Sequence, residues 1–262
     1  MHGELIPKIS VVTVCYNAID TIEKTILSVI NQTYPNIEYI IIDGASTDGS
    51  IDIINKYRDK IAYFVSEPDK GIYDAMNKGI KAVTGEWINF MNAGDEFADI
   101  DVLSTITPQM KNADIVYGDT MLVYPIGKKL KKPLPLSQIV DRMVFGHQAT
   151  FVRAIYHKEH IFDTSFKSSA DYKFLRDAFI HGAKFQYIPV LIVNYDAEFG
   201  ISATSYLRSQ KEDARILGID QSWKWKISFA CFSLIYGFKR KMKDILPSSI
   251  VNYLRRRRLS KF

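Results

Sequence analysis

Ile9-Ser-Val-Val-Thr-Val14 is the first of three apolar runs that decide the fold, and the others are Ile37-Glu-Tyr-Ile-Ile-Ile42 and Glu86-Trp-Ile-Asn-Phe-Met91. Each run has the length and the apolar content that are typical of a buried strand. Helical patterns separate the runs from one another. Strands that alternate with helices predict an α/β protein whose sheet is mostly parallel and flanked by helices.

A polar cluster follows each run at the point where the predicted strand ends. The clusters are Cys15-Tyr-Asn17, Asp43-Gly-Ala-Ser46 and Asn92-Ala-Gly-Asp95. Ligands of open α/β sheets bind in the crevice outside the carboxyl ends of the strands. We therefore expect a carboxylate, an aromatic ring and a second carboxylate to meet on one small molecule.

Local patterns predict the remaining elements. A helix is expected to begin at Ser46 or Thr47, and another to span residues 72–83. Residues 122–132 read as a hairpin with a basic turn, and residues 187–194 as a strand.

The composition is that of a soluble globular protein, with 47% hydrophobic and 24% charged residues in a chain of 262. The two cysteines, Cys15 and Cys231, lie far apart and form no disulfide framework, which favours a reducing compartment. Residues 1–8 lack the basic-then-apolar pattern of a signal peptide. No apolar run reaches the roughly 18 residues that predict a membrane span.

The net charge of +5 is unevenly distributed along the chain. Residues 221–262 carry 11 Lys or Arg and one acidic residue, so the rest of the chain is mildly acidic. Five aromatic residues lie among these basic ones: Trp223, Trp225, Phe229, Phe232 and Tyr236. We expect them at a membrane surface, with Lys239 to Lys243 and Arg255 to Arg258 facing anionic headgroups. The alternative is that the aromatic residues pack onto the body and leave a solvated basic end.

Several classes of function are disfavoured by the motifs that are absent. No Gly-x-Gly-x-x-Gly follows the first strand, which argues against a dinucleotide-dependent dehydrogenase. A Walker-type phosphate loop, a Gly-x-Ser-x-Gly elbow and a zinc-spaced Cys/His set are also missing. The clusters suit a nucleotide instead, because Tyr16 offers a face for stacking and Asp43 could accept an N–H of the base. Near Asp95, Mg²⁺ or Mn²⁺ could bridge the protein and a diphosphate.

Six ordered blocks carry a family resemblance. The longer ones are Ser10-Val-Val-Thr-Val-Cys-Tyr-Asn17, Ile41-Ile-Asp-Gly-Ala-Ser-Thr-Asp-Gly49, Ser66-Glu-Pro-Asp-Lys-Gly-Ile-Tyr-Asp-Ala-Met-Asn-Lys-Gly79 and Gly85-Glu-Trp-Ile-Asn-Phe-Met-Asn-Ala-Gly-Asp95. The weaker ones are Gly146-His-Gln-Ala-Thr-Phe151 and Ser169-Ala-Asp-Tyr-Lys-Phe-Leu-Arg176. Together they resemble a glycosyltransferase family 2 enzyme of the Rossmann-like GT-A fold, of the bacterial polysaccharide-assembly kind.

The resemblance implies a GT-A domain over residues 1–215, with a nucleotide-binding half (1–97) and an acceptor-side half (98–215). A basic, amphipathic helical tail (216–262) would follow. The implied nucleotide-binding residues are Val14, Tyr16, Asn17, Asp43, Asp69, Tyr73, Asn77, Asn92 and Ala93.

The resemblance also implies the reacting groups. Asp95 falls in the metal-binding motif, and Asp171 falls where such enzymes keep the carboxylate that deprotonates the acceptor hydroxyl. His147 and Gln148 would line the acceptor site. Each residue has a plainer alternative: Asp43 could begin a turn, and Asp95 or Asp171 could cap a helix.

Two departures from the family pattern stand out. Asp43-Gly44-Ala45-Ser46 replaces the Asp-Asp-Gly-Ser of many relatives. In the metal motif only Asp95 is a carboxylate, where many relatives have Asp-x-Asp-Asp, so the metal would bind more weakly or with help from Glu96.

The sequence therefore predicts an inverting, metal-dependent glycosyltransferase of cell-surface polysaccharide synthesis. The donor is a nucleotide sugar, with a UDP-sugar favoured, and the acceptor is a saccharide or lipid-linked saccharide. We expect the enzyme in the cytoplasm, peripheral on the inner face of the cell membrane. The alternatives are a nucleotide-sugar-binding protein with lost or residual catalysis and a nucleic-acid-binding protein. The acidic body and the lack of a nucleic-acid module argue against the latter. The sugar, the linkage and the oligomeric state stay open.

Overall fold

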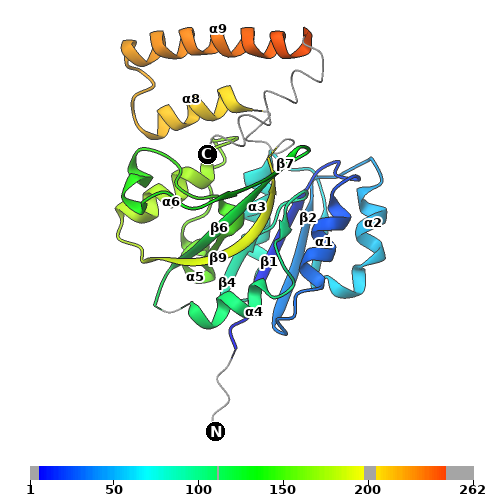
Figure 1. Cartoon of the computed structure of the whole chain (residues 1–262). Coiled ribbons are helices and arrows are strands. Elements are labelled where there is room, and N and C mark those ends of the chain that lie inside the picture. The colour runs from blue at the N-terminus through cyan, green and yellow to red at the C-terminus, as the bar shows by residue number, and fades with distance from the viewer. Residues whose placement is uncertain (1–5, 111, 198–204, 246–262) are drawn as a thin grey trace.

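The protein forms one nine-stranded sheet with helices on both faces (Figure 1). The structure is a computed structural model, and it describes residues 6–110, 112–197 and 205–245. The strand order is β3-β2-β1-β4-β8-β6-β9-β5, and β7 pairs with β6. The strands are β1 Ile9–Cys15, β2 Ile37–Asp43, β3 Tyr63–Ser66, β4 Trp87–Phe90, β5 Glu96–Phe97, β6 Ile115–Tyr124, β7 Gly127–Lys131, β8 Thr150–Arg153 and β9 Phe185–Asp196.

The first half of the sheet is the parallel ladder that the three apolar runs predict. β1 pairs in parallel with both β2 and β4, and β2 pairs in parallel with β3. Cys15 lies opposite Asp43 in the register, so the first two strands end level with each other. The carboxyl ends of β1, β2 and β4 therefore present their polar clusters at one edge of the sheet.

The second half brings the antiparallel pairs. β8 runs antiparallel to both β4 and β6, while β6 and β9 pair in parallel with a register shift at Asp119. β5 pairs antiparallel with the end of β9, where Glu96 lies opposite Asn194. This pairing excludes the alternative that Asp95 caps a helix, because the next residues form a strand. It also brings the end of β9 to the third polar cluster.

Helices cover the two faces with separate cores. One core packs α1, α2 and α4 against the sheet, and the other packs α3, α5 and α6. Gly79 lies inside α3, where a Cβ atom would come within 2.5 Å of Val12 Cγ1, so this glycine permits α3 to pack closely on β1. The helices are α1 Ile22–Ile30, α2 Ser50–Lys56, α3 Ile72–Ala82, α4 Val102–Ile106, α5 Ala154–Glu159, α6 Ala170–Ile180, α8 Tyr206–Ile216 and α9 Trp223–Ile245.

The last two helices, α8 and α9, lie side by side, with α8 between α9 and the sheet (Figure 1). The ring of Tyr206 in α8 packs against Phe232 and is stacked 5.5 Å from Tyr236, both of α9. Lys211 lies over the ring of Phe229, which stacks on Trp225.

Four of the five aromatic residues expected at a membrane thus make contacts on the α8 side or within α9. Trp223 and Phe232 of that group are nevertheless 68% and 37% exposed, and their place at a membrane stays a prediction. Arg255 to Arg258 lie outside the described residues.

No helix in residues 6–110, 112–197 and 205–245 is both long and apolar enough to cross a membrane. The predicted boundary between residues 215 and 216 falls in the last turn of α8 and stays a prediction.

Candidate active site

The loops that follow β1 and β2 are tied together by hydrogen bonds between them. The backbone N–H of Asn17 donates to Ser46 Oγ at 2.8 Å, and Asn17 Oδ1 accepts from the N–H of Thr47 at 2.9 Å. Asn17 and Ala45 both adopt left-handed backbone conformations, with φ of +46° and +64°. The side chain of Asn17 therefore helps to hold these two loops together.

Asp43 is fully buried beneath these loops. Its carboxylate accepts hydrogen bonds from Ser46 N at 2.9 Å, Ser46 Oγ at 2.5 Å and Ser66 Oγ at 2.6 Å. The oxygens expected to accept from a nucleotide base thus bond to the protein itself. Asp43 thus organises the turn, in line with the plainer of the two sequence interpretations, and its contact with a nucleotide stays a prediction.

Tyr16 and Asp69, two more of the predicted nucleotide contacts, both lie close to Gly44. Tyr16 is 66% exposed, and a Cβ atom on Gly44 would lie 3.3 Å from its ring and 2.5 Å from Asp69 Oδ2. The other oxygen of Asp69 accepts the N–H of Gly71 at 2.7 Å. Gly44 therefore permits Asp69 and the Tyr16 ring to pack closely against the backbone, while most of the Tyr16 side chain stays exposed.

Four more of the predicted nucleotide contacts are Val14, Ala93, Asn77 and Tyr73, and each has partners within the protein. Val14 is buried in the core, and its carbonyl accepts the N–H of Ala93 at 3.2 Å. The Asn77 amide is also buried and clamps the backbone of Phe162, donating to its carbonyl and accepting its N–H, both at 2.9 Å. Asn77 therefore stays outside the group at the strand ends. The fourth, Tyr73, belongs to the carboxylate described next.

Asp171 lies in the first turn of α6 and accepts three hydrogen bonds. His147 Nδ1 lies 2.7 Å from Oδ2, while the hydroxyl of Tyr73 and the N–H of Tyr172 donate to Oδ1 at 2.8 and 2.9 Å. Burial alone would raise the pKa of Asp171, but the hydrogen bonds from His147, Tyr73 and Tyr172 hold it below its usual value. The carboxylate is thus ionised and fixed in orientation.

His147 joins Asp171 to the third polar cluster. Its Nε2 lies 3.0 Å from Asn92 Nδ2, which can only donate, so Nε2 accepts and Nδ1–H donates to Asp171. The other polar atom of that amide, Asn92 Oδ1, is buried and has no hydrogen-bond partner within the protein. His147 thus contacts both Asp171 and Asn92 of the third polar cluster.

Asp95 has the opposite environment to that of Asp171. It is 5% exposed, and burial raises its pKa from the usual 3.8 to about 7. His147, the N–H of Asp196 at 3.4 Å and the side chain of Gln148 offset part of this rise, whereas the charge of Asp196 adds to it.

The sequence interpretation missed Asp196. The signal was present, because Tyr195-Asp196 is one more polar cluster where a strand ends.

Few protein groups near Asp95 could bind a divalent cation. Within the described part of the chain, no group of three or more His, Cys, Asp or Glu could hold a metal ion. Mg²⁺ is commonly bound through one or two carboxylates plus substrate phosphates rather than by an all-protein cage. Asp95 and the unpartnered Asn92 Oδ1 fit that sparse mode, in which the cation arrives with the nucleotide.

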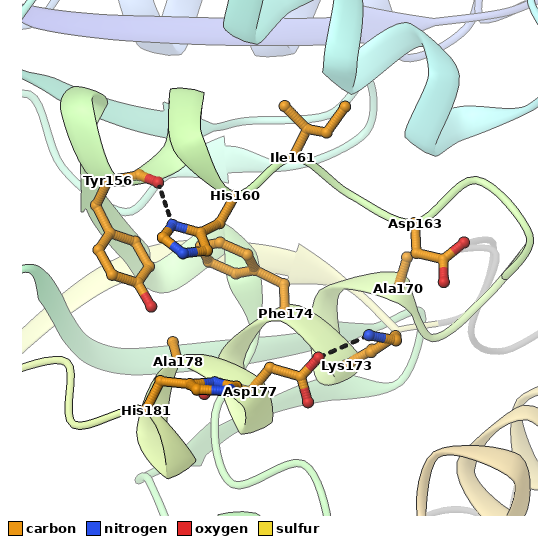
Figure 2. A pocket seen from close by; sticks show the side chains of 10 residues that line it. All are labelled: Tyr156, His160, Ile161, Asp163, Ala170, Lys173, Phe174, Asp177, Ala178 and His181. Atoms are coloured by element: carbon orange, nitrogen blue, oxygen red, sulfur yellow. Dashed lines mark hydrogen bonds and ion pairs between the residues drawn. The ribbon is translucent and has the colours of Figure 1, made fainter.

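Two cavities adjoin α6. One of about 320 Å³ lies between α5 and α6, with Tyr156, His160, Lys173 and Asp177 among its lining residues (Figure 2). None of the predicted site residues lines it. A second, of about 20 Å³, lies at His147 and Asp171 and is lined by His157 and several apolar side chains.

Comparison with known proteins finds similar glycosyltransferases. The model of Glycosyl transferase family 2 matches residues 10–170. An uncharacterized glycosyltransferase of Mycobacterium tuberculosis is 32% identical over 179 residues, which are 64% of this chain and 68% of that protein. A PGL/p-HBAD biosynthesis glycosyltransferase of Mycobacterium bovis is 26% identical over 212 residues, which are 78% of this chain and 80% of that protein.

Solved structures share the fold. S. aureus TarS 1–349 in complex with UDP-GlcNAc matches with a TM-score of 0.67 at 19% identity, over 81% of this chain and 66% of that one. The mannosyltransferase PcManGT from Pyrobaculum calidifontis, in complex with GDP-Man and Mn²⁺, matches with a TM-score of 0.63 at 16% identity, over 89% of this chain and 75% of that one. The GT-A fold prediction is confirmed. Because the family model covers more than half of the sequence, the chain belongs to glycosyltransferase family 2.

Proposed function

We propose that this chain transfers a sugar from a nucleotide sugar, with UDP as the carrier, to a hydroxyl of a saccharide or lipid-linked saccharide. The observation that carries the proposal is the partly buried carboxylate of Asp171, oriented by His147 and Tyr73 and joined through His147 to the loop of Asp95. In this proposal the base, the cation and the exposed ring of Tyr16 all act on one donor bound at the strand ends.

The proposed reaction is a single displacement with inversion. The acceptor oxygen attacks the anomeric carbon from the face opposite the diphosphate, and the bond from that carbon to the diphosphate oxygen breaks. The diphosphate leaves with the electron pair, while the acceptor proton passes to Asp171. Burial raises the pKa of Tyr73, and the charge of Asp171 adds to this effect. The Tyr73 hydroxyl therefore stays protonated and keeps donating to the carboxylate.

The donor site combines Tyr16 and Asp69 on either side of Gly44. The ring of Tyr16 would stack on the base, and Asp69 would accept an N–H or a ribose hydroxyl. The UDP-GlcNAc complex of TarS supports a UDP-linked donor, and the GDP-Man complex of PcManGT names the competing carrier.

Mg²⁺ or Mn²⁺ would be held by Asp95 and Asn92 Oδ1 together with the diphosphate. Such a cation stabilises the charge that develops on the leaving diphosphate. The Mn²⁺ complex of PcManGT supports a divalent ion at this kind of site. His147 and Gln148 lie next to these groups and would line the acceptor side.

The exposed side of α9 supports the proposal that the enzyme acts at a membrane surface. Trp223, Ile227, Leu234 and Phe238, here called the outer stripe, are 68%, 58%, 75% and 67% exposed. Their spacing places them on one face of the helix, away from the aromatic residues that contact α8. Lys239 and Lys241 are exposed close to this stripe, so an anionic lipid surface matches it in polarity and charge. The proposed location is the inner face of the cell membrane.

A donor screen tests the proposal. UDP-, GDP- and dTDP-sugars, each with and without Mn²⁺, are compared for thermal stabilisation, because a ligand that binds only the folded state raises its stability. Turnover is then measured for the parent and for Asp171→Asn, which should lose about 10²–10⁴-fold in kcat and keep its donor affinity. Metal-dependent binding without turnover by the parent would favour a nucleotide-sugar-binding protein instead.

A further inference from the structure

Helix α6 presents Asp171 to the site, but its first turn has no cap of its own. Ser169 is the N-cap residue, and its side chain makes no capping hydrogen bond. The backbone N–H groups at the start of a helix need partners, which a short polar side chain usually supplies locally. Here the partner comes from another helix.

Glu212 of α8 binds the backbone N–H of the N-cap residue Ser169 and those of the two residues before it. Its Oε1 accepts the N–H of Lys167 at 2.9 Å, and its Oε2 accepts the N–H groups of Ser168 and Ser169 at 2.8 and 3.0 Å. A carboxylate at a helix N-terminus is also favoured by the helix dipole. Three charge-assisted bonds thus hold the backbone immediately before Ala170.

Arg215, one turn further along α8, holds the same loop. Its Nη2 donates to Ser165 Oγ at 3.0 Å, and its guanidinium carbon lies 4.3 Å from the ring centroid of Phe166. Phe166 is buried in the core that supports α6. Residues 165–169 are therefore fixed by one face of α8.

The same loop also reaches the donor side. Lys167 Nζ donates to the backbone carbonyl of Lys70 at 2.9 Å, directly beside Asp69. The segment held by Glu212 thus bridges the proposed base and the proposed nucleotide contact.

We propose that Glu212 is a positioning residue that sets the alignment of Asp171 by capping α6 from α8; this rests on the base role proposed for Asp171. Its contacts are to backbone N–H groups before the helix, so it acts through the helix and not on the substrate. Misplacing a catalytic group by 1 Å can cost about 10²-fold in rate.

The test compares Glu212→Ala and Glu212→Gln with Glu159→Gln, a matched change of an exposed glutamate at the end of α5. Kinetics are measured on the full chain, well below the unfolding temperature, and kcat is expressed per folded molecule. Glu212→Ala should lower kcat about 10- to 100-fold with donor KM within about twofold. Glu212→Gln keeps one carbonyl acceptor, so its kcat should lie between those of Glu212→Ala and the parent. Glu159→Gln should have the kcat of the parent.

A double-mutant cycle with Asp171→Asn separates the two proposals. If Glu212 acts through Asp171, adding Glu212→Ala to Asp171→Asn should lower kcat by less than about twofold. A full additional loss in that background overturns the positioning role, and so does a lower unfolding temperature with unchanged kcat in the Glu212 variants. Full activity of Asp171→Asn refutes the base assignment itself, and with it the role of Glu212. If Glu212→Ala does not fold, Glu212→Gln carries the same cycle.

Discussion

Replacing Asp95 by Asn should stabilise the metal-free protein, and the gain should grow with pH. Burial raises the pKa of Asp95 from 3.8 to about 7, and the unfolded chain restores the usual value. A difference of about three between the two pKa values corresponds to about 4 kcal/mol in the free energy of unfolding. Asn has a similar shape and carries no charge, so it removes the cost of burying the carboxylate.

The sign follows from proton binding. Between pH 3.8 and about 7 the folded state binds the Asp95 proton more tightly than the unfolded state does. The stabilisation from this protonated carboxyl is complete below pH 3.8 and is lost as the pH rises through about 7. The free energy of unfolding of Asp95→Asn minus that of the parent should be small near pH 4 and approach about 4 kcal/mol at pH 8.

Urea unfolding of chelator-treated protein at pH 5, 6, 7 and 8 measures this difference. Asp119→Asn is the matched control, since Asp119 is another buried carboxylate, which accepts the Tyr187 hydroxyl at 2.8 Å. With UDP and Mn²⁺ present the order should reverse, because only the parent can bind the cation through Asp95. Equal pH dependence of parent and Asp95→Asn in chelator would refute the burial argument. Equal stabilisation of both by UDP with Mn²⁺ would refute the metal assignment.

Two further predictions concern other regions. His157 is 1% exposed, and burial lowers its pKa from 6.5 to about 4, so about 3 kcal/mol of stability should be lost as the pH falls from 6.5 to 4. His157→Phe should flatten that loss in urea unfolding, and an unchanged pH slope would contradict the assignment. The full chain should co-sediment with anionic vesicles in a salt-sensitive way, whereas a chain ending at Asp220 should not; failure of both to bind would rule out attachment through α9.

The fold was largely predictable because its first half is built from local signals. Apolar runs of strand length, separated by amphipathic helices, are sufficient to predict a parallel ladder. The curl of the second half depends on β9, which pairs with β6 on one edge and β5 on the other. The pairing with β6 joins residues about 70 apart and the pairing with β5 joins residues about 98 apart, and neither has a local pattern. It nevertheless decides that Asp196 lies beside Asp95.

The loop after β2 shows why a motif alone does not decide the role of a residue. The sequence allowed Asp43 either to bind a ligand or to begin a turn. In the structure its carboxylate accepts hydrogen bonds from two serine hydroxyls and one backbone N–H, which favours the turn. The same contacts explain why α2 begins at Ser50 and not at Ser46 or Thr47. Ser46 is bound to Asp43, and Gly49 has a φ of +98°, so a regular helix starts only after it.

The candidate site residues were named from the family resemblance, but the contacts between them could not be predicted from it. The contact between His147 and Asp171 spans 24 residues, and that between Tyr73 and Asp171 spans 98. Asn77 has the same side chain as Asn92, and only tertiary packing makes one a buried clamp and leaves the other with an unpartnered oxygen. The sequence identifies candidate side chains, whereas their burial and hydrogen-bond partners indicate which roles they can have.

The two carboxylates of the candidate site, Asp171 and Asp95, have opposite environments, and this supports different roles for them. Asp171 accepts three donors that lower its pKa, so it is ionised and ready to accept a proton. For Asp95 burial outweighs its donors and raises its pKa to about 7, so a divalent cation would supply the missing compensation. His147 donates to Asp171 and also moderates the pKa of Asp95. Pairs of titratable groups with diverging pKa values are the usual mark of divided chemical roles. This divergence supports the proposed roles of Asp171 as the base and of Asp95 as the cation ligand.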